Sequence, residues 1–314
     1  MACTYRLGIC ARVDGHRRRV VGRPSRAHHS QNVTLAARAN AGWEASLALE
    51  FSARDTRSVL THRAHHGPLH VQKPFYPEAD GTCHIYVLHP PGGVVGGDVL
   101  QINLVVHSAA QALVTTPAAT KFYRSGERYA AQTLRAQVAN GATLEWLPQE
   151  TIVFDDAWAR NSARVDLARD ARFIGWEVVC LGRPVNHQTF TRGAWQQRLE
   201  VWREDMPLFI DRSDVRGNAP VLTQSWGWAG YSVSGLLVCA TPDLPRELLE
   251  TLRDACAALQ RDGVFSATQL RGVLVCRYLG HHAQQARRCL QRAWEILRPE
   301  YLGKAAQAPR IWNT

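Results

Sequence analysis

The sequence predicts a mainly β fold, in which stacked sheets of short strands form a β-helix-like body that carries a small C-terminal helical pair. Short segments that read as strands follow one another between residues 43 and 202, with turn residues between them. Helical periodicity appears only after residue 243. Because no long helical pattern interrupts the strands, the sequence argues against βαβ crossovers and a Rossmann-type sheet.

The first predicted strand runs from Trp43 to Phe51 and places apolar residues at odd positions, which is typical of a half-buried strand. Further strands are expected over residues 84–88, 99–106, 112–116, 132–138, 143–147, 151–154, 172–181 and 198–202. Turn-forming residues separate them, for example at Asn140-Gly141 and Arg192-Gly193. Such regular spacing indicates stacked sheets.

Two helices are expected after these strands. Apolar residues between Leu244 and Leu259 share one helical face, with Asp243 as the N-cap and Gly263 as the stop. In the second helix, apolar residues recur at intervals of three and four from Ala283, and Pro299 is expected to end it. A strand over residues 272–279 lies between the two helices.

These patterns divide the chain into a basic extension over residues 1–41, expected to be disordered, and one domain over residues 42–314. Within that domain we expect a β-body over 42–240, a helix-strand-helix appendage over 241–300 and a C-terminal tail over 301–314.

The basic charge lies mostly in the N-terminal extension. The formal net charge is +10, and residues 1–38, with eight arginines and one aspartate, account for +7 of it. A basic arm of this kind is more often solvated than a reader of DNA, so we expect no nucleic-acid partner. The alternative, a nucleic-acid binder that acts through this arm, predicts a steep dependence of binding on salt.

Cysteine usage and hydropathy indicate a cytoplasmic protein. The eight cysteines include no Cys-x-x-Cys pair, which argues against the usual zinc and thioredoxin motifs. The sequence shows neither an apolar segment of signal-peptide length nor a run of about eighteen apolar residues for a membrane span. A reduced compartment and no membrane association are therefore expected.

The run Pro90-Pro91-Gly92-Gly93-Val94-Val95-Gly96-Gly97-Asp98 is the most unusual stretch of the chain. Glycine is selected where φ is positive or where another group approaches the backbone closely. The spacing of Gly92 and Gly97 matches a P-loop, but Asp98 and Val99 replace the lysine and hydroxyl residue that phosphate binding needs. A carboxylate here suits a cation or a partner's amide. The alternative is a tight loop in which Asp98 caps a turn.

Other polar clusters give weaker signals. Histidines at 62, 65, 66 and 70 have spacings compatible with metal binding, but Gly67-Pro68 breaks their strand, so a solvated strand end is favoured. The carboxylates between Glu145 and Asp156 stand among large apolar residues, where burial requires a partner or a cation; the alternative is that they are acids at strand ends that face water. The segment 115–125 combines hydroxyls, bases and aromatics, a composition suited to a protein interface or an anion contact. No complete nucleophile, base and orienting residue is found.

Read together, these motifs closely resemble the UreD family of urease accessory proteins, also called UreH. The matching stretches are GPL at 67–69, QKPFYPE at 72–78, CH at 83–84, LHPPGGVVGGD at 88–98, TKFYRS at 120–125, LEWLPQE at 144–150, LGRP at 181–184 and PRIWNT at 309–314. The resemblance extends from about Trp43 to the last residue.

The resemblance implies a non-enzymatic scaffold that binds the urease apoprotein (UreABC) and recruits UreF and the GTPase UreG, so that nickel passes toward the urease active site. It implies no permanently bound cofactor but a transient Ni²⁺, and an internal polar route lined partly by carboxylates. Three positions match candidate route residues, namely Asp98, Glu150 and Thr120. Interface anchors are expected at Tyr123, Arg124, Arg310 and Trp312, and homodimerisation within the complex is a further expectation.

Two departures from the family pattern stand out. His187-Gln188 replaces a common Gly-Glu pair, and Ala306 replaces a proline after Gly303-Lys304. If the glutamate of that pair helps to pass nickel, this chain lacks its charge or substitutes an imidazole nearby. An alternative function, a metal-dependent hydrolase of unknown substrate that uses Asp98, Glu150 and a histidine, stays open at this point.

Overall fold

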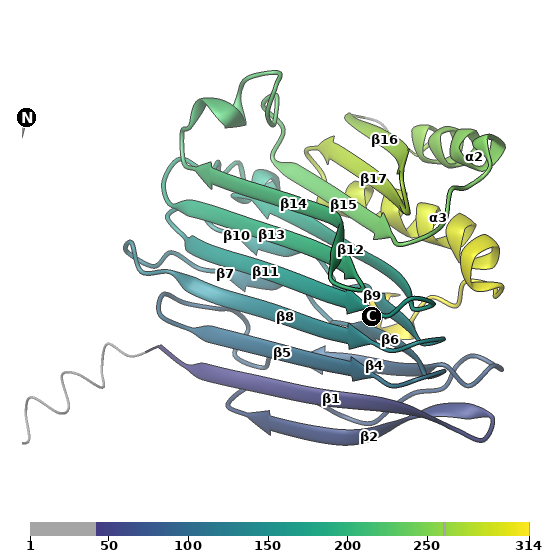
Figure 1. Cartoon of the computed structure of the whole chain (residues 1–314). Coiled ribbons are helices and arrows are strands. Elements are labelled where there is room, and N and C mark those ends of the chain that lie inside the picture. The colour runs from purple at the N-terminus through teal and green to yellow at the C-terminus, as the bar shows by residue number, and fades with distance from the viewer. Residues whose placement is uncertain (1–41, 260–261, 314) are drawn as a thin grey trace, which may run out of the picture. The chain divides into compact units, whose positions relative to one another are not determined.

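The computed structural model describes residues 42–259 and 262–313, and Figure 1 shows them as two β-sheets with helices at one side. The predicted extension over residues 1–41 lies outside the described residues. The strands are β1 (Glu44–Arg54), β2 (Arg57–His66), β3 (His70–Val71), β4 (Cys83–Leu88), β5 (Val99–Val106), β6 (Gln111–Thr115), β7 (Thr120–Phe122), β8 (Ala130–Val138), β9 (Thr143–Trp146), β10 (Thr151–Val153), β11 (Trp158–Leu167), β12 (Arg172–Leu181), β13 (Ala194–Arg203), β14 (Met206–Arg216), β15 (Val233–Cys239), β16 (Gly263–Leu270) and β17 (Val273–Gly280).

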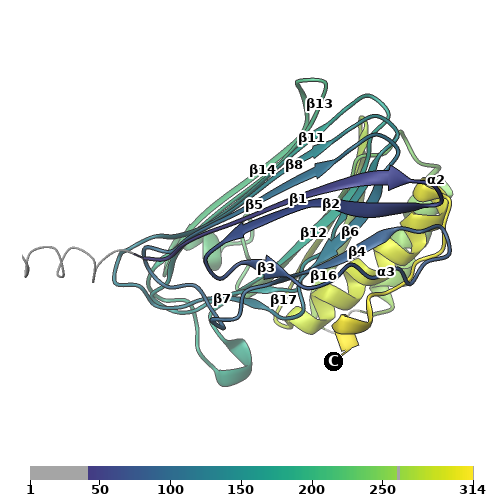
Figure 2. The same cartoon turned by 90° about the horizontal axis from the view of Figure 1, so that it is seen from below.

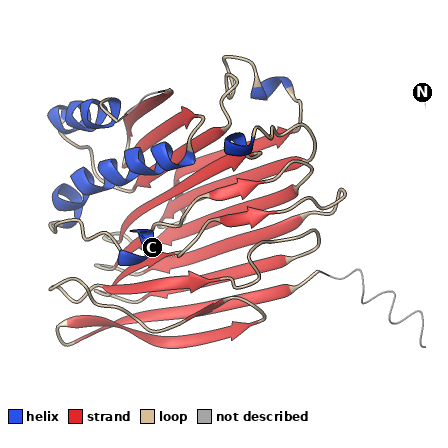
Figure 3. Cartoon of the chain, turned by 180° about the vertical axis from the view of Figure 1, so that it is seen from behind, coloured by secondary structure: helices blue, strands red, loops and turns tan. Residues whose placement is uncertain are grey.

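The helices are fewer and lie mostly after residue 240. They are η1 (Pro184–Asn186), η2 (Pro220–Leu222), α2 (Arg246–Ala257), α3 (Ala283–Leu302) and η3 (Arg310–Asn313). Figure 3, seen from behind, shows the two long helices on one face of a sheet.

The strands form a seven-stranded sheet and a ten-stranded sheet. The seven-stranded sheet has the order β14-β13-β11-β8-β5-β1-β2, and the main path of the other sheet is β16-β17-β15-β12-β9-β6-β4-β3. Between β4 and β13 the chain passes back and forth between the sheets, so that successive strands of each sheet pair mostly in parallel. This repeated crossing confirms the predicted mainly β, β-helix-like fold with a C-terminal helical pair.

Two hydrophobic cores result from this layering (Figure 2). One lies between the sheets, and the other lies between the ten-stranded sheet and the helices. Strand β12 serves both, because Phe173 and Val179 face the first core while Ile174 and Trp176 face the second. A strand buried on both faces explains the nearly continuous apolar run in its sequence.

The predicted helix limits were wrong in detail. Helix α2 begins after Pro245 rather than at an Asp243 cap, and Gly263 starts β16 rather than ending a helix. Helix α3 continues past Pro299 to Leu302. The proline lacks a backbone N–H, but the N–H of Gly303 still donates to the Pro299 carbonyl at 2.9 Å, which closes the last turn.

The segment between the helices contains two strands rather than the single predicted one. Strand β17 covers the predicted segment, and β16 was not predicted. Both strands continue the ten-stranded sheet beyond β15. The predicted domain boundaries themselves stay a prediction.

Candidate functional site

The glycine-rich run forms a loop that Asp98 fastens from within. The Asp98 side chain is buried, and its two carboxylate oxygens accept hydrogen bonds from the backbone N–H of Trp43 at 2.7 Å and of Val95 at 2.9 Å. This geometry joins the start of β1 to the loop. Both oxygens already accept backbone donors, and a role of Asp98 on a nickel route stays a prediction.

The glycine loop packs directly on the segment 120–125, so the structure brings two of the sequence motifs together. The N–H of Val94 donates to the Lys121 carbonyl at 2.7 Å, and the N–H of Tyr123 donates to the Val94 carbonyl at 2.9 Å. A Cβ added to Gly93 would lie 2.2 Å from Cε2 of Tyr123. Close approach of these two segments therefore explains why this position holds glycine.

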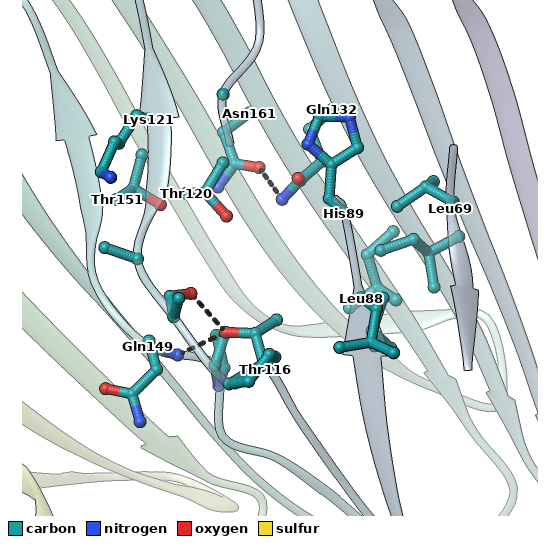
Figure 4. A pocket seen from close by; sticks show the side chains of 18 of the residues that line it. Leu69, Leu88, His89, Thr116, Thr120, Lys121, Gln132, Gln149, Thr151 and Asn161 are labelled. Carbon is teal, nitrogen blue, oxygen red and sulfur yellow. Dashed lines mark hydrogen bonds between the residues drawn. The ribbon is translucent and has the colours of Figure 1, made fainter. Parts of the chain in front are cut away.

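A cavity of about 460 Å³ opens beside this pair of motifs and extends between the sheets (Figure 4). His89, Thr120 and Lys121 are among the residues that line it, and burial lowers the pKa of His89. Its lining is mixed, with the polar Gln132 and Asn161 beside the apolar Ile102, Leu134 and Val178. Of the three predicted route residues, Thr120 lines this cavity.

Glu150 lies elsewhere. Its backbone carbonyl accepts the N–H of Thr120 at 2.9 Å, but Glu150 lines a separate groove of about 1040 Å³ together with Tyr123 and Arg183. The structure therefore places Asp98, Thr120 and Glu150 in three different surroundings, a packed loop, an internal cavity and an outer groove. It does not gather them around one point.

A row of polar side chains crosses the inner face of the seven-stranded sheet. Gln132, Asn161, Gln197 and Ser213 occupy paired positions on the neighbouring strands β8, β11, β13 and β14. The other inward positions of these strands are mostly apolar and buried, as expected for the core between two sheets. The polar row is therefore a specific interruption of that core.

Glu177 on β12 faces this row from the opposite sheet. Asn161 Nδ2 donates to Glu177 Oε1 at 3.1 Å, and Gln197 Nε2 donates to Glu177 Oε2. Gln132 Nε2 in turn donates to the Asn161 amide oxygen at 3.4 Å. In this series of hydrogen bonds every donor points toward Glu177, so the glutamate is the final acceptor.

The environment of Glu177 disfavours its charged form. Burial is the largest cause and raises its pKa to about 7, and the nearby Asp211 carboxylate also raises it, while the bonds from Gln197 and Asn161 act in the opposite direction. No salt bridge involves Glu177 among the described residues. The interior thus holds a carboxylate whose partners are neutral amides.

Glu177 also lines a second cavity, of about 400 Å³. Gln197, Asp211, Ser213 and Arg277 contribute to its wall. Arg277 Nη2 lies 2.7 Å from Asp211 Oδ1 and links the two sheets there. Because Glu177 lines both cavities, it stands between them, and the polar row extends from one cavity to the other.

The predicted interface anchors differ in exposure. Tyr123 is half-buried, and Arg124 and Arg310 are exposed. Trp312 is buried, with its ring centroid 5.3 Å from that of Trp176, and its Nε1 donates to Thr115 Oγ1 at 2.8 Å. Its indole fastens the C-terminal segment to the second core. Roles of these residues in partner binding stay predictions.

The remaining sequence signals gave no site. The histidines at 62, 65 and 66 are exposed on β2, as expected for a solvated strand end, and His187 is exposed in the loop after η1. Within residues 42–259 and 262–313, no group of three or more His, Cys, Asp or Glu residues is placed to hold a metal ion. The described helices include none long and apolar enough to cross a membrane.

Sequence reasoning missed Glu177 and its amide partners. The available signals were a single carboxylate inside the apolar segment 173–181 and polar residues at inward positions of strands. Asn161 was missed because β11 itself was not predicted.

The family model and several relatives that this chain matches carry the same family name. The family model described as "UreD urease accessory protein" matches residues 43–313. The chain is 45% identical over 273 residues to "Urease accessory protein UreD" of Dechloromonas aromatica (strain RCB), covering 87% of this chain and 95% of that protein. It is 43% identical to "Urease accessory protein UreD 2" of Brucella anthropi, covering 87% and 99% of the two chains. A third relative, from Methylobacillus flagellatus, is 40% identical over 90% of this chain and 99% of its own.

Proposed function

This chain belongs to the UreD family of urease accessory proteins, and from that membership we propose that it is a scaffold that guides nickel through its interior during urease maturation. Its role in urease maturation follows from the family. The interior route, the metal and the individual partners are the parts that we propose.

One observation carries the proposal: the polar row that connects two cavities through Glu177. A core between two sheets normally buries apolar side chains, and buried polar groups lower stability unless they are satisfied. This chain nevertheless places three amides in register on one sheet and a carboxylate opposite them on the other sheet. A row of polar side chains that reaches from one cavity to the other offers oxygen donors to a hydrated or partly hydrated ion in an otherwise apolar core.

The donor types fit a divalent cation that must be released again. The row offers one carboxylate and amide oxygens, and such a sparse set of oxygen donors binds more weakly than a closed Cys/His site. Ni²⁺ is the cargo in this account and not a resident cofactor. Thr120 and His89 line the first cavity, Glu177 lines both cavities, and Asp211 and Arg277 line the second. In this account Asp98 fastens the glycine-rich loop, of which Gly92 and Gly93 line the first cavity, and Glu150 lines the separate groove next to it.

Assembly with UreF, the GTPase UreG and the urease apoprotein, with homodimerisation inside that complex, belongs to the same proposal. The exposed Arg124 and Arg310 are surface positions available for such contacts. The free cysteines at positions 83, 180, 239, 256, 276 and 289 suit the reduced cytoplasm, in which we place this assembly. In this account the chain performs no catalysis of its own.

The experiment compares two isosteric substitutions in the complete maturation system at limiting nickel. Glu177→Gln removes the interior charge, and we expect urease activation to fall severalfold while the complex still assembles. Glu200→Gln is the matched control, since Glu200 is also buried but pairs with Arg198 on the outer face of the seven-stranded sheet. Wild-type activation by Glu177→Gln at limiting nickel contradicts the proposed route.

A further inference from the structure

Trp158 and Trp202 lie at opposite ends of the outer face of the seven-stranded sheet, and an arginine covers each ring. Helices α2 and α3 pack on the other sheet and leave this face uncovered (Figures 1 and 3). The guanidinium carbon of Arg164 lies 4.5 Å from the centre of the Trp202 ring, and that of Arg216 lies 5.0 Å from the centre of the Trp158 ring. Because the two pairs consist of the same residue types, their surroundings can be compared directly.

The strand register explains how Arg216 reaches Trp158. Ala194 of β13 pairs with Trp158 of β11 on one side and with Arg216 of β14 on the other. The methyl group of Ala194 is buried and too small to separate its neighbours, so Arg216 spans the intervening strand and packs on the indole ring.

Carboxylates complete the Trp202 pair. Trp202 Nε1 donates to Glu200 Oε2 at 3.2 Å. Arg164 donates to the two oxygens of Asp166, at 2.7 and 3.1 Å, and lies 3.9 Å from Glu200 Oε2. Arg198 also pairs with Glu200. Both the indole and the guanidinium of this pair therefore have an anionic acceptor.

The indole of the Trp158 pair lacks such an acceptor among the described residues. Trp158 Nε1 is shielded from water and makes no hydrogen bond there. The Tyr129 hydroxyl is likewise shielded and unpaired within these residues, and its ring packs edge-on against that of Trp158, with the ring centres 5.4 Å apart. The guanidinium carbon of Arg160 lies 3.9 Å from the centre of the Tyr129 ring. Two unpaired donors thus lie beside two guanidinium groups, which lowers stability unless an acceptor is supplied.

The two arginines beside these donors are only partly neutralised. Arg160 Nε donates to the Gln196 amide oxygen at 2.8 Å, which is a neutral acceptor. Arg216 Nε lies 4.0 Å from Asp214 Oδ1, beyond hydrogen-bond distance, and the other oxygen of Asp214 accepts the Gln196 amide at 3.1 Å. Four donor groups and a surplus of positive charge therefore meet at this point. We call the four residues the outer-face cluster: Tyr129, Trp158, Arg160 and Arg216.

We propose that the outer-face cluster binds the carboxylate group of a ligand. A carboxylate supplies two acceptor oxygens and the negative charge that the cluster lacks. Glu200 shows, on the same sheet face, that one carboxylate accepts a tryptophan N–H and pairs with arginines at once. Both arginine side chains of the cluster are exposed, so they are free to turn aside and admit the ligand to the shielded donors. None of the four residues lines either interior cavity, so this inference goes beyond the proposed function and does not depend on it.

Such a carboxylate belongs either to a small free ligand or to an aspartate or glutamate of a protein that lies on this face. Acetate presents the group alone. N-acetylglutamate α-amide presents it as a protein side chain does, because its α-amino and α-carboxyl groups are both capped. Comparison of the two probes therefore distinguishes the two sources.

The test records the tryptophan indole N–H signals of the purified full-length chain by nuclear magnetic resonance during titration with acetate. Trp158→Phe and Trp202→Phe identify the two signals by their absence. We expect acetate to shift the Trp158 signal saturably, because this N–H gains a charged acceptor. The Trp202 signal should stay in place, because its N–H already donates to Glu200. Sodium chloride at the same ionic strength should move neither signal.

Matched substitutions then test the residues of the cluster. Arg216→Gln removes one charged donor and should raise the dissociation constant of acetate about tenfold. Arg212→Gln is the control, since Arg212 is exposed on the same face of the same strand but lies 3.7 Å from Glu200, and it should bind acetate like the wild type. Tyr129→Phe should weaken binding by a smaller factor. Without acetate it should not lower the melting temperature, because the hydroxyl has no partner to lose.

Three results overturn the inference. They are the absence of a saturable shift of the Trp158 signal with both probes, an equal shift with sodium chloride, and an equal loss of acetate binding in Arg212→Gln and Arg216→Gln. Similar dissociation constants for acetate and the capped glutamate support a side chain of a bound protein as the ligand. Binding of acetate alone supports a small free carboxylate.

Discussion

Arg298 of α3 and Glu145 of β9 form a fully buried ion pair that fastens the C-terminal helix to the ten-stranded sheet. Arg298 Nη2 lies 2.9 Å from Glu145 Oε1, and Nε lies 3.0 Å from Oε2. Trp294 Nε1 donates to the same carboxylate at 2.7 Å, and Arg298 Nη2 also meets Glu78 Oε1 at 2.7 Å. The attraction of the two carboxylates outweighs burial and raises the pKa of Arg298. The buried carboxylate in the 144–150 motif therefore has the partner that its apolar neighbours require.

Removing one member of this buried ion-pair network is expected to destabilise the protein. Arg298→Met leaves Glu145 buried without its counter-charge and should lower the free energy of unfolding by about 3–5 kcal/mol. Arg292→Met is the control, because Arg292 is exposed and its contact with Glu295 is long, at 3.4 Å. That change should stay within about 0.5 kcal/mol. Urea denaturation measures both variants, and equal effects contradict a structural role for the buried pair.

Gly93 offers a second test, which concerns the contact between the glycine-rich loop and the segment 120–125. Gly93→Ala introduces a Cβ that overlaps the Tyr123 ring and should reduce stability by about 1–3 kcal/mol. The double variant Gly93→Ala/Tyr123→Ala removes the obstruction, so the glycine substitution should cost much less in that background. Thermal unfolding of the four proteins in this cycle gives the coupling. If the effects of the two substitutions on stability are additive, the Tyr123 ring is not the reason why position 93 holds glycine.

Glu177 predicts how stability depends on pH. Its pKa is about 7 in the folded protein, well above the ordinary value of 4.5 for a glutamate, so between these values the folded state holds a proton that the unfolded state has lost. Glu177 therefore contributes to the free energy of unfolding at low pH, and this stabilisation is lost as the pH rises through about 7. Across that window it amounts to about 3 kcal/mol, at 1.36 kcal/mol for each pKa unit.

Glu177→Gln should remove this dependence. Relative to the wild type, the variant should gain stability as the pH rises from 5 to 8, because the amide has no proton to lose. Denaturation at several pH values measures the difference. A constant difference between the two proteins over this range shows that Glu177 does not change its protonation on folding.

Asp98 separates a structural role from a role in transport. Asp98→Ala leaves the N–H groups of Trp43 and Val95 without their acceptor and should lower stability by about 1–3 kcal/mol. Asp98→Asn keeps one acceptor oxygen and should lie between that variant and the wild type. If Asp98→Asn, the milder of the two in its effect on stability, lowers urease activation at limiting nickel as much as Asp98→Ala does, Asp98 acts on the cargo as well as on the loop.

The sequence predicted the fold class because strand alternation survives wherever one face of a strand is buried. It predicted neither β11 nor β14, since β11 buries small residues such as Ala159 and Ala163 and β14 is an edge strand with polar inward positions such as Asp211 and Ser213. Such segments carry little hydrophobic contrast. Pro299 was read as a helix end because proline usually breaks helices, but it lies in the final turn, where one lost bond matters little.

The site was harder to predict than the fold. Motif-rich loops drew attention to Asp98, Thr120 and Glu150, whereas the polar row depends on four strands lying in register with a fifth in the facing sheet. No local pattern shows that Gln132 and Gln197 belong to one row, because they are 65 positions apart in the sequence. Long-range pairing of this kind appears only when the sheets are assembled.

The most direct test of the interior route is urease activation at limiting nickel by two single variants and their combination. Thr120→Trp fills part of the first cavity, and Glu177→Gln replaces the carboxylate that lines both cavities by a neutral amide. If both act on one path, each should lower activation severalfold and the double variant should be no worse than the more impaired single variant. Multiplied losses in the double variant, or wild-type activation by either single variant, contradict passage of nickel through this interior.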